Sequence, residues 1–147
     1  MTTDYTGRPE TAASDDLTPA KLILDLSFSE SDLVGLRSAV AAHASAAGMD
    51  DHHIEVLVFI AYELSTNAVR HGGGHGRLRL WRGDDDIHCQ VSDHGPGLPQ
   101  AMTTPAQPPL AAASGRGLWL VHTFADTFTA TSDDTGASVV ATMRLNP

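Results

Sequence analysis

The sequence has a single cysteine, Cys89, among its 147 residues. One cysteine allows neither an intrachain disulfide nor a cysteine-rich zinc site, so neither can hold this chain together. No run of about 18 apolar residues occurs, and the first residues lack the apolar core of a signal peptide. We therefore expect a cytoplasmic protein without a membrane-spanning segment.

Positive charge is also scarce. Nine Lys and Arg residues stand against 18 Asp and Glu residues, which gives a formal net charge of −9 and a pI near 5.1. This balance repels phosphate backbones and anionic lipids, so we expect no direct binding to nucleic acid or membrane. The partners should be proteins or small molecules. Hydrophobic residues make up 41% of the chain, which suits a single core.

The chain divides into a tail and one domain. Residues 1–20 carry no periodic apolar pattern and are predicted to be a disordered tail, whereas residues 21–147 are predicted to fold as one unit. In residues 21–28 the apolar side chains Leu22, Leu24, Leu26 and Phe28 alternate with the others, which predicts a half-buried strand. A polar, proline-rich segment at residues 98–114 is typical of a lid or binding loop.

The remaining elements follow from periodicity and capping residues. A helix capped by Ser29 or Ser31 should run to Gly48, and a second should run from Asp50 or Asp51 to His71. A short helix is predicted at residues 117–125, and hairpins at 77–92 and 126–145. The expected core residues are Ile54, Leu57, Ile60 or Ala61, Leu64 and Ala68 on the second helix, with Leu78, Leu80, Ile87, Cys89 and Val91 on the first hairpin.

This order of elements predicts the fold class. Hairpins dominate and helices come in a block, which is typical of an α+β two-layer sandwich with a mixed, mainly antiparallel sheet and helices on one face. A doubly wound sheet would need alternating βαβ units, which the pattern lacks.

The second predicted helix carries the first polar cluster. Glu63, Asn67 and His71 are four residues apart and share one helix face. An Asn oxygen can ligate Mg²⁺, and a carboxylate one turn earlier can act as a general base. The alternative interpretation is a plain solvated helix face.

The second cluster follows the strand that ends at Ser92. Asp93 can accept a hydrogen bond from an exocyclic amine such as that of adenine, while Gly95 and Gly97 allow a flat ligand to approach the backbone. The alternative is an ordinary turn, since Asp, Gly and Pro are common turn residues.

The third cluster, Gly115-Arg116-Gly117-Leu118, opens the predicted short helix. Backbone N–H groups at a helix start attract phosphate, and glycines leave room for it. The alternative is a plain loop-to-helix junction, and the spacing excludes a P-loop. Taken in order, the three clusters supply a metal ligand, a base reader and a phosphate cradle, which a magnesium nucleotide site requires.

These segments resemble the N-box and the two glycine boxes of the GHKL ATPases. The resemblance implies the Bergerat ATP-binding fold with ATP and Mg²⁺ as cofactors. It implies that Glu63 is the general base, that Asn67 binds Mg²⁺, and that Asp93 binds the adenine amino group. The other ATP-binding residues it implies are Arg70 and His71 of the N-box, Gly95 and Gly97 at the adenine pocket and lid hinge, and Gly115, Arg116, Gly117 and Leu118 at the phosphates.

Within that superfamily the sequence is most similar to bacterial anti-sigma-factor serine/threonine kinases. We expect neither a preceding phosphoacceptor-histidine helix nor a transducer domain in a chain of 147 residues. The resemblance implies a sigma factor and an anti-anti-sigma (STAS-like) protein as partners, and leaves a homodimer open. The alternative function is a non-catalytic binding module, with nucleotide as a structural ligand or absent.

One residue departs from the family pattern. The family often has Thr after the glycine of the last hairpin, whereas Ala137 follows Gly136 here, which leaves Ser138 as the alternative source of a hydroxyl. Cys89 is predicted to be a buried structural thiol, and Trp119 and Phe124 are predicted to be core, with Trp119 alternatively flanking the nucleotide. A metal pair formed by His71 and His75 lacks further ligands at a usual spacing.

Overall fold

The structure, a computed structural model, describes residues 20–95 and 116–146. Most of the predicted tail, the segment 98–114, and the predicted site residues Gly97 and Gly115 lie outside these ranges. The elements are β1 (Lys21–Ser29), the 3₁₀ turn η2 (Glu30–Asp32), α1 (Leu33–Ala46), α2 (Asp51–His71), β2 (His75–Arg82), β3 (Asp86–Asp93), α4 (Arg116–Phe124), β4 (Thr127–Asp133) and β5 (Gly136–Arg144).

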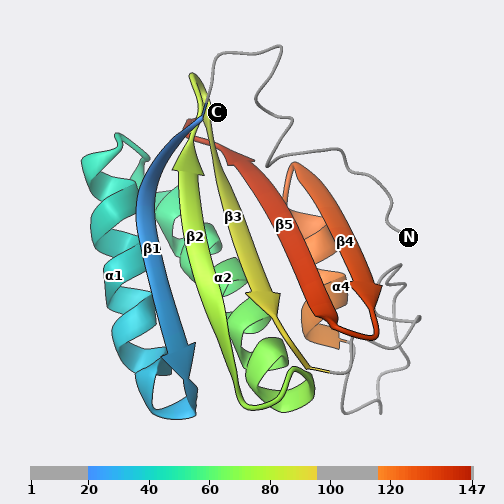
Figure 1. Cartoon of the computed structure of the whole chain (residues 1–147). Coiled ribbons are helices and arrows are strands. Elements are labelled where there is room, and N and C mark those ends of the chain that lie inside the picture. The colour runs from blue at the N-terminus through green and yellow to red at the C-terminus, as the bar shows by residue number, and fades with distance from the viewer. Residues whose placement is uncertain (1–19, 96–115, 147) are drawn as a thin grey trace.

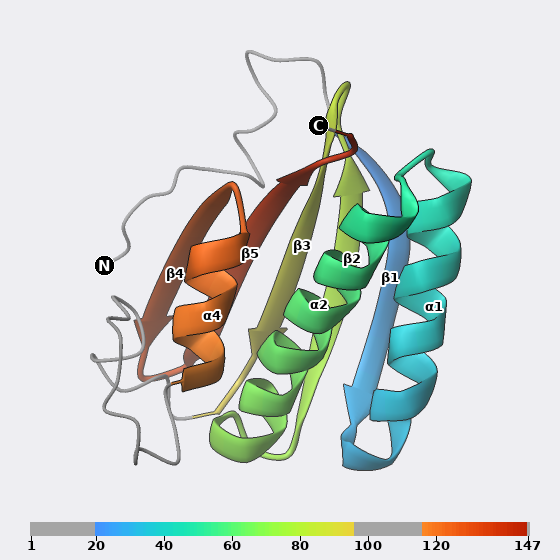
Figure 2. The ribbon, with the colours of Figure 1, turned by 180° about the vertical axis from the view of Figure 1, so that it is seen from behind.

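The described strands form one sheet in the order β1-β2-β3-β5-β4, and all neighbouring strands are antiparallel. Figure 1 shows the sheet in front of the helices, and the view from behind in Figure 2 shows α1, α2 and α4 side by side on one face. The predicted α+β sandwich with helices on one face is therefore confirmed, and the sheet, predicted to be mixed and mainly antiparallel, is antiparallel at every described strand pair. No helix of the described residues is long and apolar enough to cross a bilayer.

The core lies between the sheet and the helices. The predicted core residues of α2 and of the hairpin are buried, apart from Ile54, which is partly buried. Ile60 and Ala61 are both fully buried because α2 packs against α1 and α4 as well as the sheet. The largest fully buried side chains include Leu36, Leu57, Ile60, Leu78, Leu80, Ile87 and Leu118.

The prediction for the first residues of β1 is wrong. The register of β1 against β2 shifts between Leu22 and Leu24, so the simple alternation begins only after this bulge. Leu22 is 41% exposed, whereas Ile23 packs against the core.

The two long helices begin differently. The N-cap of α1 is Asp32, which makes no side-chain capping bond, so the prediction of Ser29 or Ser31 as the cap of this helix is wrong; Ser29 is the N-cap of the turn η2 instead. The backbone N–H and hydroxyl of Ser29 both donate to the Asp32 carboxylate, at 2.9 and 3.2 Å, in the turn that leads into α1. The Asp50 carboxylate accepts a 2.9 Å hydrogen bond from the backbone N–H of His53 and so caps α2. Of the two residues predicted to start the second helix, Asp50 is the cap and Asp51 is the first helical residue.

Candidate functional site

Residues of all three predicted clusters meet at one cavity. It is lined by Asn67 of α2, Asp93 of β3 and Leu118 of α4, with Ala137 of β5. The end of α2, the end of β3 and the start of α4 reach the same edge of the sheet, as Figure 2 shows. Residues far apart in the sequence therefore converge as the nucleotide-site prediction requires.

The cavity is small. Its volume is about 10 Å³, which is room for about one water molecule. Leu118, with 1% of its surface exposed, is one of the buried side chains that line the cavity. The described residues that line this cavity therefore lie close to one another.

Asp93 is held at the end of β3. Its Oδ1 accepts a 2.9 Å hydrogen bond from the backbone N–H of Gly95, and its Cα is in register with that of Ala137 on β5. A Cβ atom on Gly72, directly after α2, would lie 2.4 and 2.5 Å from the Cγ and Oδ2 atoms of Asp93. Gly72 therefore allows the end of α2 to approach the carboxyl group closely.

Two more glycines make this approach possible. A Cβ on Gly95 would lie 2.4 Å from the carbonyl carbon of Gly72. Gly136 has φ +149° and a Cβ there would lie 2.0 Å from the backbone oxygen of Asp93. The sequence predicted Gly95 as a site residue and placed Gly136 in the last hairpin, but it gave Gly72, directly after the second predicted helix, no part in the site. Only the tertiary contact shows that all three surround Asp93.

Glu63 lies one turn before Asn67 on α2 and is partly buried. Burial raises the pKa of its carboxyl group, and the nearby positive charge of Arg70 partly offsets this effect. A raised pKa makes the ionised carboxylate a stronger base. Glu63 is not among the residues that line the small cavity, so it lies beside the space around Asn67 rather than inside it.

The end of α2 carries the other two predicted N-box residues. Arg70 is exposed. His71 is partly buried, and its Nε2 atom is buried with no hydrogen-bond partner among the described residues. A solvated face is therefore a poor description of the Glu63, Asn67 and His71 stripe, because all three residues are partly buried.

The third cluster opens a helix, as predicted. Arg116 and Gly117 are the first two residues of α4, and Leu118 lines the cavity. The first backbone N–H groups of a helix have no partner within it, which suits them to bind phosphate.

Ser138 does not replace the hydroxyl that Ala137 lacks. Ala137 lines the cavity and is 7% exposed. Ser138 points to the opposite face of the sheet, where its Oγ accepts a 3.2 Å hydrogen bond from Gln90 Nε2. The expectation that Ser138 could supply this contact is wrong because neighbouring residues of a strand face opposite sides.

The other candidate residues have structural positions. Cys89 is fully buried and burial raises the pKa of its thiol to about 12, which confirms a structural thiol. The described residues contain no cluster of three or more potential metal ligands. Phe124 is 51% exposed, contrary to the core prediction, although its ring makes an edge contact with that of Phe59. Trp119 is partly buried.

Fold and site together define an ATPase-type domain with helices on one face of an antiparallel sheet. The family model for the histidine kinase-like ATPase domain matches residues 26–143, and the chain belongs to this family. Part of the resemblance to GHKL ATPases is thereby confirmed, at the level of this domain.

Solved structures with the same fold include three of the catalytic domain of the histidine kinase ThkA, all described as nucleotide-free. Two have a TM-score of 0.53 and 13% identity, and cover 84% of this chain and 97% of theirs. The third has a TM-score of 0.51 at 13% identity, with 84% and 99% covered. No curated protein matches this sequence.

Proposed function

We propose that this protein is an ATP-dependent serine/threonine protein kinase that sequesters a sigma factor and phosphorylates an anti-anti-sigma protein in the cytoplasm. The observation that carries the proposal is the convergence of Asn67, Asp93 and Leu118 on one cavity in a histidine kinase-like ATPase domain. The resemblance of the three motifs to those of anti-sigma-factor kinases supports this kinase class over the other GHKL ATPases.

The residues of the site fit a magnesium nucleotide. The amide oxygen of Asn67 would hold Mg²⁺, and Asp93 Oδ2 would accept a hydrogen bond from the adenine amino group. Bound Mg²⁺ would neutralise charge on the phosphates. Glu63, whose pKa is raised by burial, would take the proton from the acceptor hydroxyl.

A protein substrate is consistent with the charge of the chain. A net charge of −9 disfavours nucleic acid and anionic membranes, which leaves proteins as macromolecular partners. The partner pair of sigma factor and STAS-like antagonist follows from the motif resemblance. Copurification from the native cell would identify both proteins.

The kinase is tested by mixing the purified protein with labelled ATP, Mg²⁺ and candidate anti-anti-sigma domains. We expect label on a Ser or Thr of one domain, and a rate that falls by about 10²–10⁴ in Glu63→Gln, which is the usual contribution of a general base. Absence of transfer to every candidate, with ATP bound, would contradict the kinase. An undiminished rate in Glu63→Gln would remove Glu63 from the mechanism.

A non-catalytic binding module is the second candidate. The small volume of the cavity and the methyl group of Ala137 beside Asp93 favour it. Thermal melts with and without Mg-ATP discriminate the two, because a ligand at 100 times its dissociation constant adds about 2.7 kcal/mol to the free energy of unfolding. A shift supports nucleotide binding, and no shift favours the module.

A further inference from the structure

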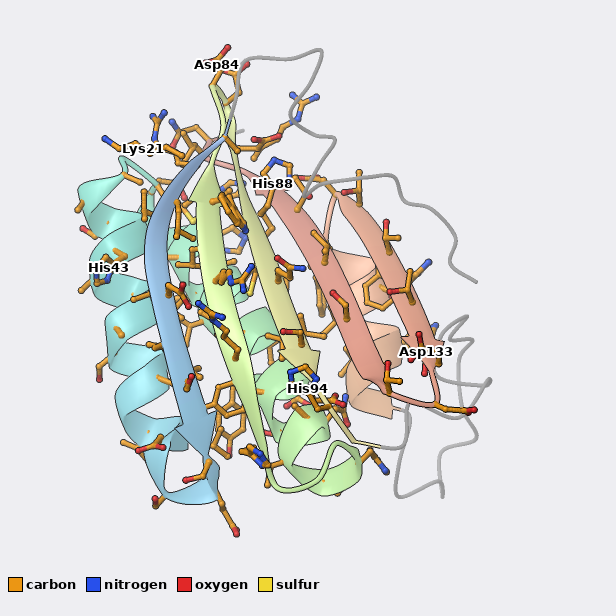
Figure 3. The ribbon with its side chains drawn as sticks, viewed as in Figure 1. Lys21, His43, Asp84, His88, His94 and Asp133 are labelled. Carbon is orange, nitrogen blue, oxygen red and sulfur yellow. The ribbon has the colours of Figure 1, made fainter. Side chains whose placement is uncertain are left out.

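The open face of the sheet has a second, much larger hollow. A groove of about 640 Å³ lies at the ends of β1, β2 and β3, and is lined by Ser27, Arg77, Arg79, Ser92 and His94 among others. Figure 3 shows His94 just beyond the end of β3, at the lower edge of the sheet. The helices lie on the other face of the sheet. The groove meets the cavity at Asn67 at one residue, Asp93, which lines both.

Strand register brings the polar side chains of the groove together. Arg77 of β2 is paired with Ser27 of β1 on one side and with Ser92 of β3 on the other. Arg79 lies two residues further along β2 and faces the same side, because side chains alternate along a strand. Two guanidinium groups and two hydroxyls therefore share one patch of the sheet.

The carboxylate beside this patch is already engaged. Both oxygens of Asp25 accept hydrogen bonds from Arg77, at 2.8 Å from Nε and 2.7 Å from a terminal nitrogen. The Asp32 carboxylate, at the edge of the groove, accepts from Ser29. Asp93, the third carboxylate at the groove, accepts a hydrogen bond from the backbone N–H of Gly95 through Oδ1. Each of these three carboxylates therefore already accepts at least one hydrogen bond within the protein.

Several donors at the groove have no hydrogen-bond partner within the described part of the chain. Arg79 lies 3.9 Å from Asp25 but makes no hydrogen bond with the described residues, and neither do the side chains of Ser27, Ser92 and His94. A partly buried guanidinium presents up to five N–H donors in a planar fork that matches phosphate or carboxylate oxygens. With hydroxyl donors on both neighbouring strands, the groove suits a ligand that offers several acceptor oxygens in a tetrahedral arrangement.

We propose that this groove binds a phosphoryl group, with Arg79 as its main donor and Ser27 and Ser92 as flanking donors. Asp25 competes with the ligand for Arg77 and Arg79, so it weakens binding in the free protein. The phosphoryl group is either free phosphate or a phosphorylated serine side chain. The donors lie on the open face of the sheet, and although Asp93 borders both sites, binding here requires neither nucleotide nor kinase activity.

The test is a titration of the isotopically labelled full chain, followed by NMR at constant pH and low salt. Inorganic phosphate is used in one arm and O-phosphoserine in the other, with serine as the blank. We expect saturable shifts at Ser27, Arg79, Ser92 and His94. Tighter binding in the phosphoserine arm identifies a phosphorylated side chain as the source, whereas tighter binding of inorganic phosphate identifies the free ion.

Three variants make the assignment specific. Arg79→Gln should weaken phosphate binding at least about five-fold, and Asp25→Asn should strengthen it because Arg77 is released, as charge-assisted hydrogen bonds predict. Arg144→Gln is the matched control, since it removes the same charge from an exposed position on β5. Should Arg79→Gln fail to fold, the gain expected for Asp25→Asn still tests the proposal.

Several outcomes would overturn it. Shifts that do not saturate, or that centre on Asn67 and Leu118 instead, would show that the groove binds no phosphoryl group. Equal weakening by Arg144→Gln would show attraction to overall charge rather than to a site. Weaker binding by Asp25→Asn would contradict the competition between Asp25 and the ligand.

Discussion

The position of Glu63 on α2 changes the pKa of its carboxyl group. Burial raises the pKa of Glu63 in the folded protein, which means that ionising the group costs folding free energy. The stability it contributes is fully present below the pKa of the unfolded chain and is lost as the pH rises through the higher folded pKa. A residue suited to accept a proton is therefore a destabilising residue at neutral pH.

We expect Glu63→Gln to raise the melting temperature at pH 7, because the amide removes a partly buried charge without changing shape. The gain should shrink near pH 4, below the ordinary Glu pKa of about 4.3, where the wild-type side chain is itself protonated. Melts of both proteins across this range provide the measurement. A lower melting temperature for the variant at pH 7 would contradict the role of burial.

A substitution at Gly72 tests how closely the end of α2 packs against Asp93. A methyl group there would lie 2.4 to 2.6 Å from Asp93 side-chain atoms and the Ala68 oxygen, so we expect Gly72→Ala to cost about 1–3 kcal/mol, as overpacking does. Chemical denaturation measures the change.

Gly35→Ala is the matched control for this substitution. Gly35 lies inside α1 and a Cβ there meets nothing within 4 Å, so Ala should stabilise by up to about 1 kcal/mol. Opposite signs are therefore expected for the same chemical change. Similar effects at both positions would show that the contact at Gly72 does not limit packing.

Alternation within β5 determines which of two neighbouring residues belongs to the site. Ala137 faces the cavity beside Asp93, and Ser138 faces the open side of the sheet. Matching of motifs alone treats these positions as nearly equivalent. Because side chains alternate along β5, the two residues face opposite sides of the sheet.

Ala137→Ser should therefore tighten Mg-ATP binding, by about 2- to 10-fold for a hydrogen bond worth about 0.5–1.5 kcal/mol. Ser138→Ala should leave the dissociation constant unchanged, since its hydroxyl bonds Gln90 on the other face. Calorimetric titration of the two variants compares them directly. A larger effect at Ser138 would reverse the assignment of faces.

The start of α2 depends on one carboxylate. The backbone N–H of His53 donates to Asp50, and this bond, with a second from the His53 side chain, lowers the pKa of Asp50. The sign is opposite to that of Glu63: the stabilisation is present above the unfolded pKa and is lost as the pH falls through the lower folded pKa.

Asp50→Ala should accordingly lower the melting temperature at pH 7, with a difference from wild type that fades in acid. Asp51→Ala is the matched control, because it removes a charge from the first turn while the cap remains. Melts at pH 7 and in acid give both comparisons. An equal loss from Asp51→Ala would assign the effect to charge near the helix terminus rather than to the cap.

At the scale of the whole molecule, the sequence predicts much of the fold because the local signals agree. The caps, the apolar spacing of α2 and the turn residues of both hairpins place the elements within about two residues of their observed bounds. The bulge in β1 and the close packing of Gly72 and Gly95 were not predictable, because both depend on contacts between segments distant in sequence. The small cavity volume was not predictable either, because it also depends on contacts between segments distant in sequence.

A nucleotide bound at this site would join α2, β3 and α4, so its binding energy should appear as global stability rather than as a local change. If Asn67 holds Mg²⁺, chelation with EDTA should remove most of the thermal shift produced by ATP. With Asn67→Ala, ATP should raise the melting temperature only slightly, and by the same amount with Mg²⁺ or with EDTA. With Asp93→Asn, ATP should cause no rise with Mg²⁺ or with EDTA, because the contact to the adenine base is weakened. A shift in Asn67→Ala that still depends fully on Mg²⁺ would place the metal on other residues.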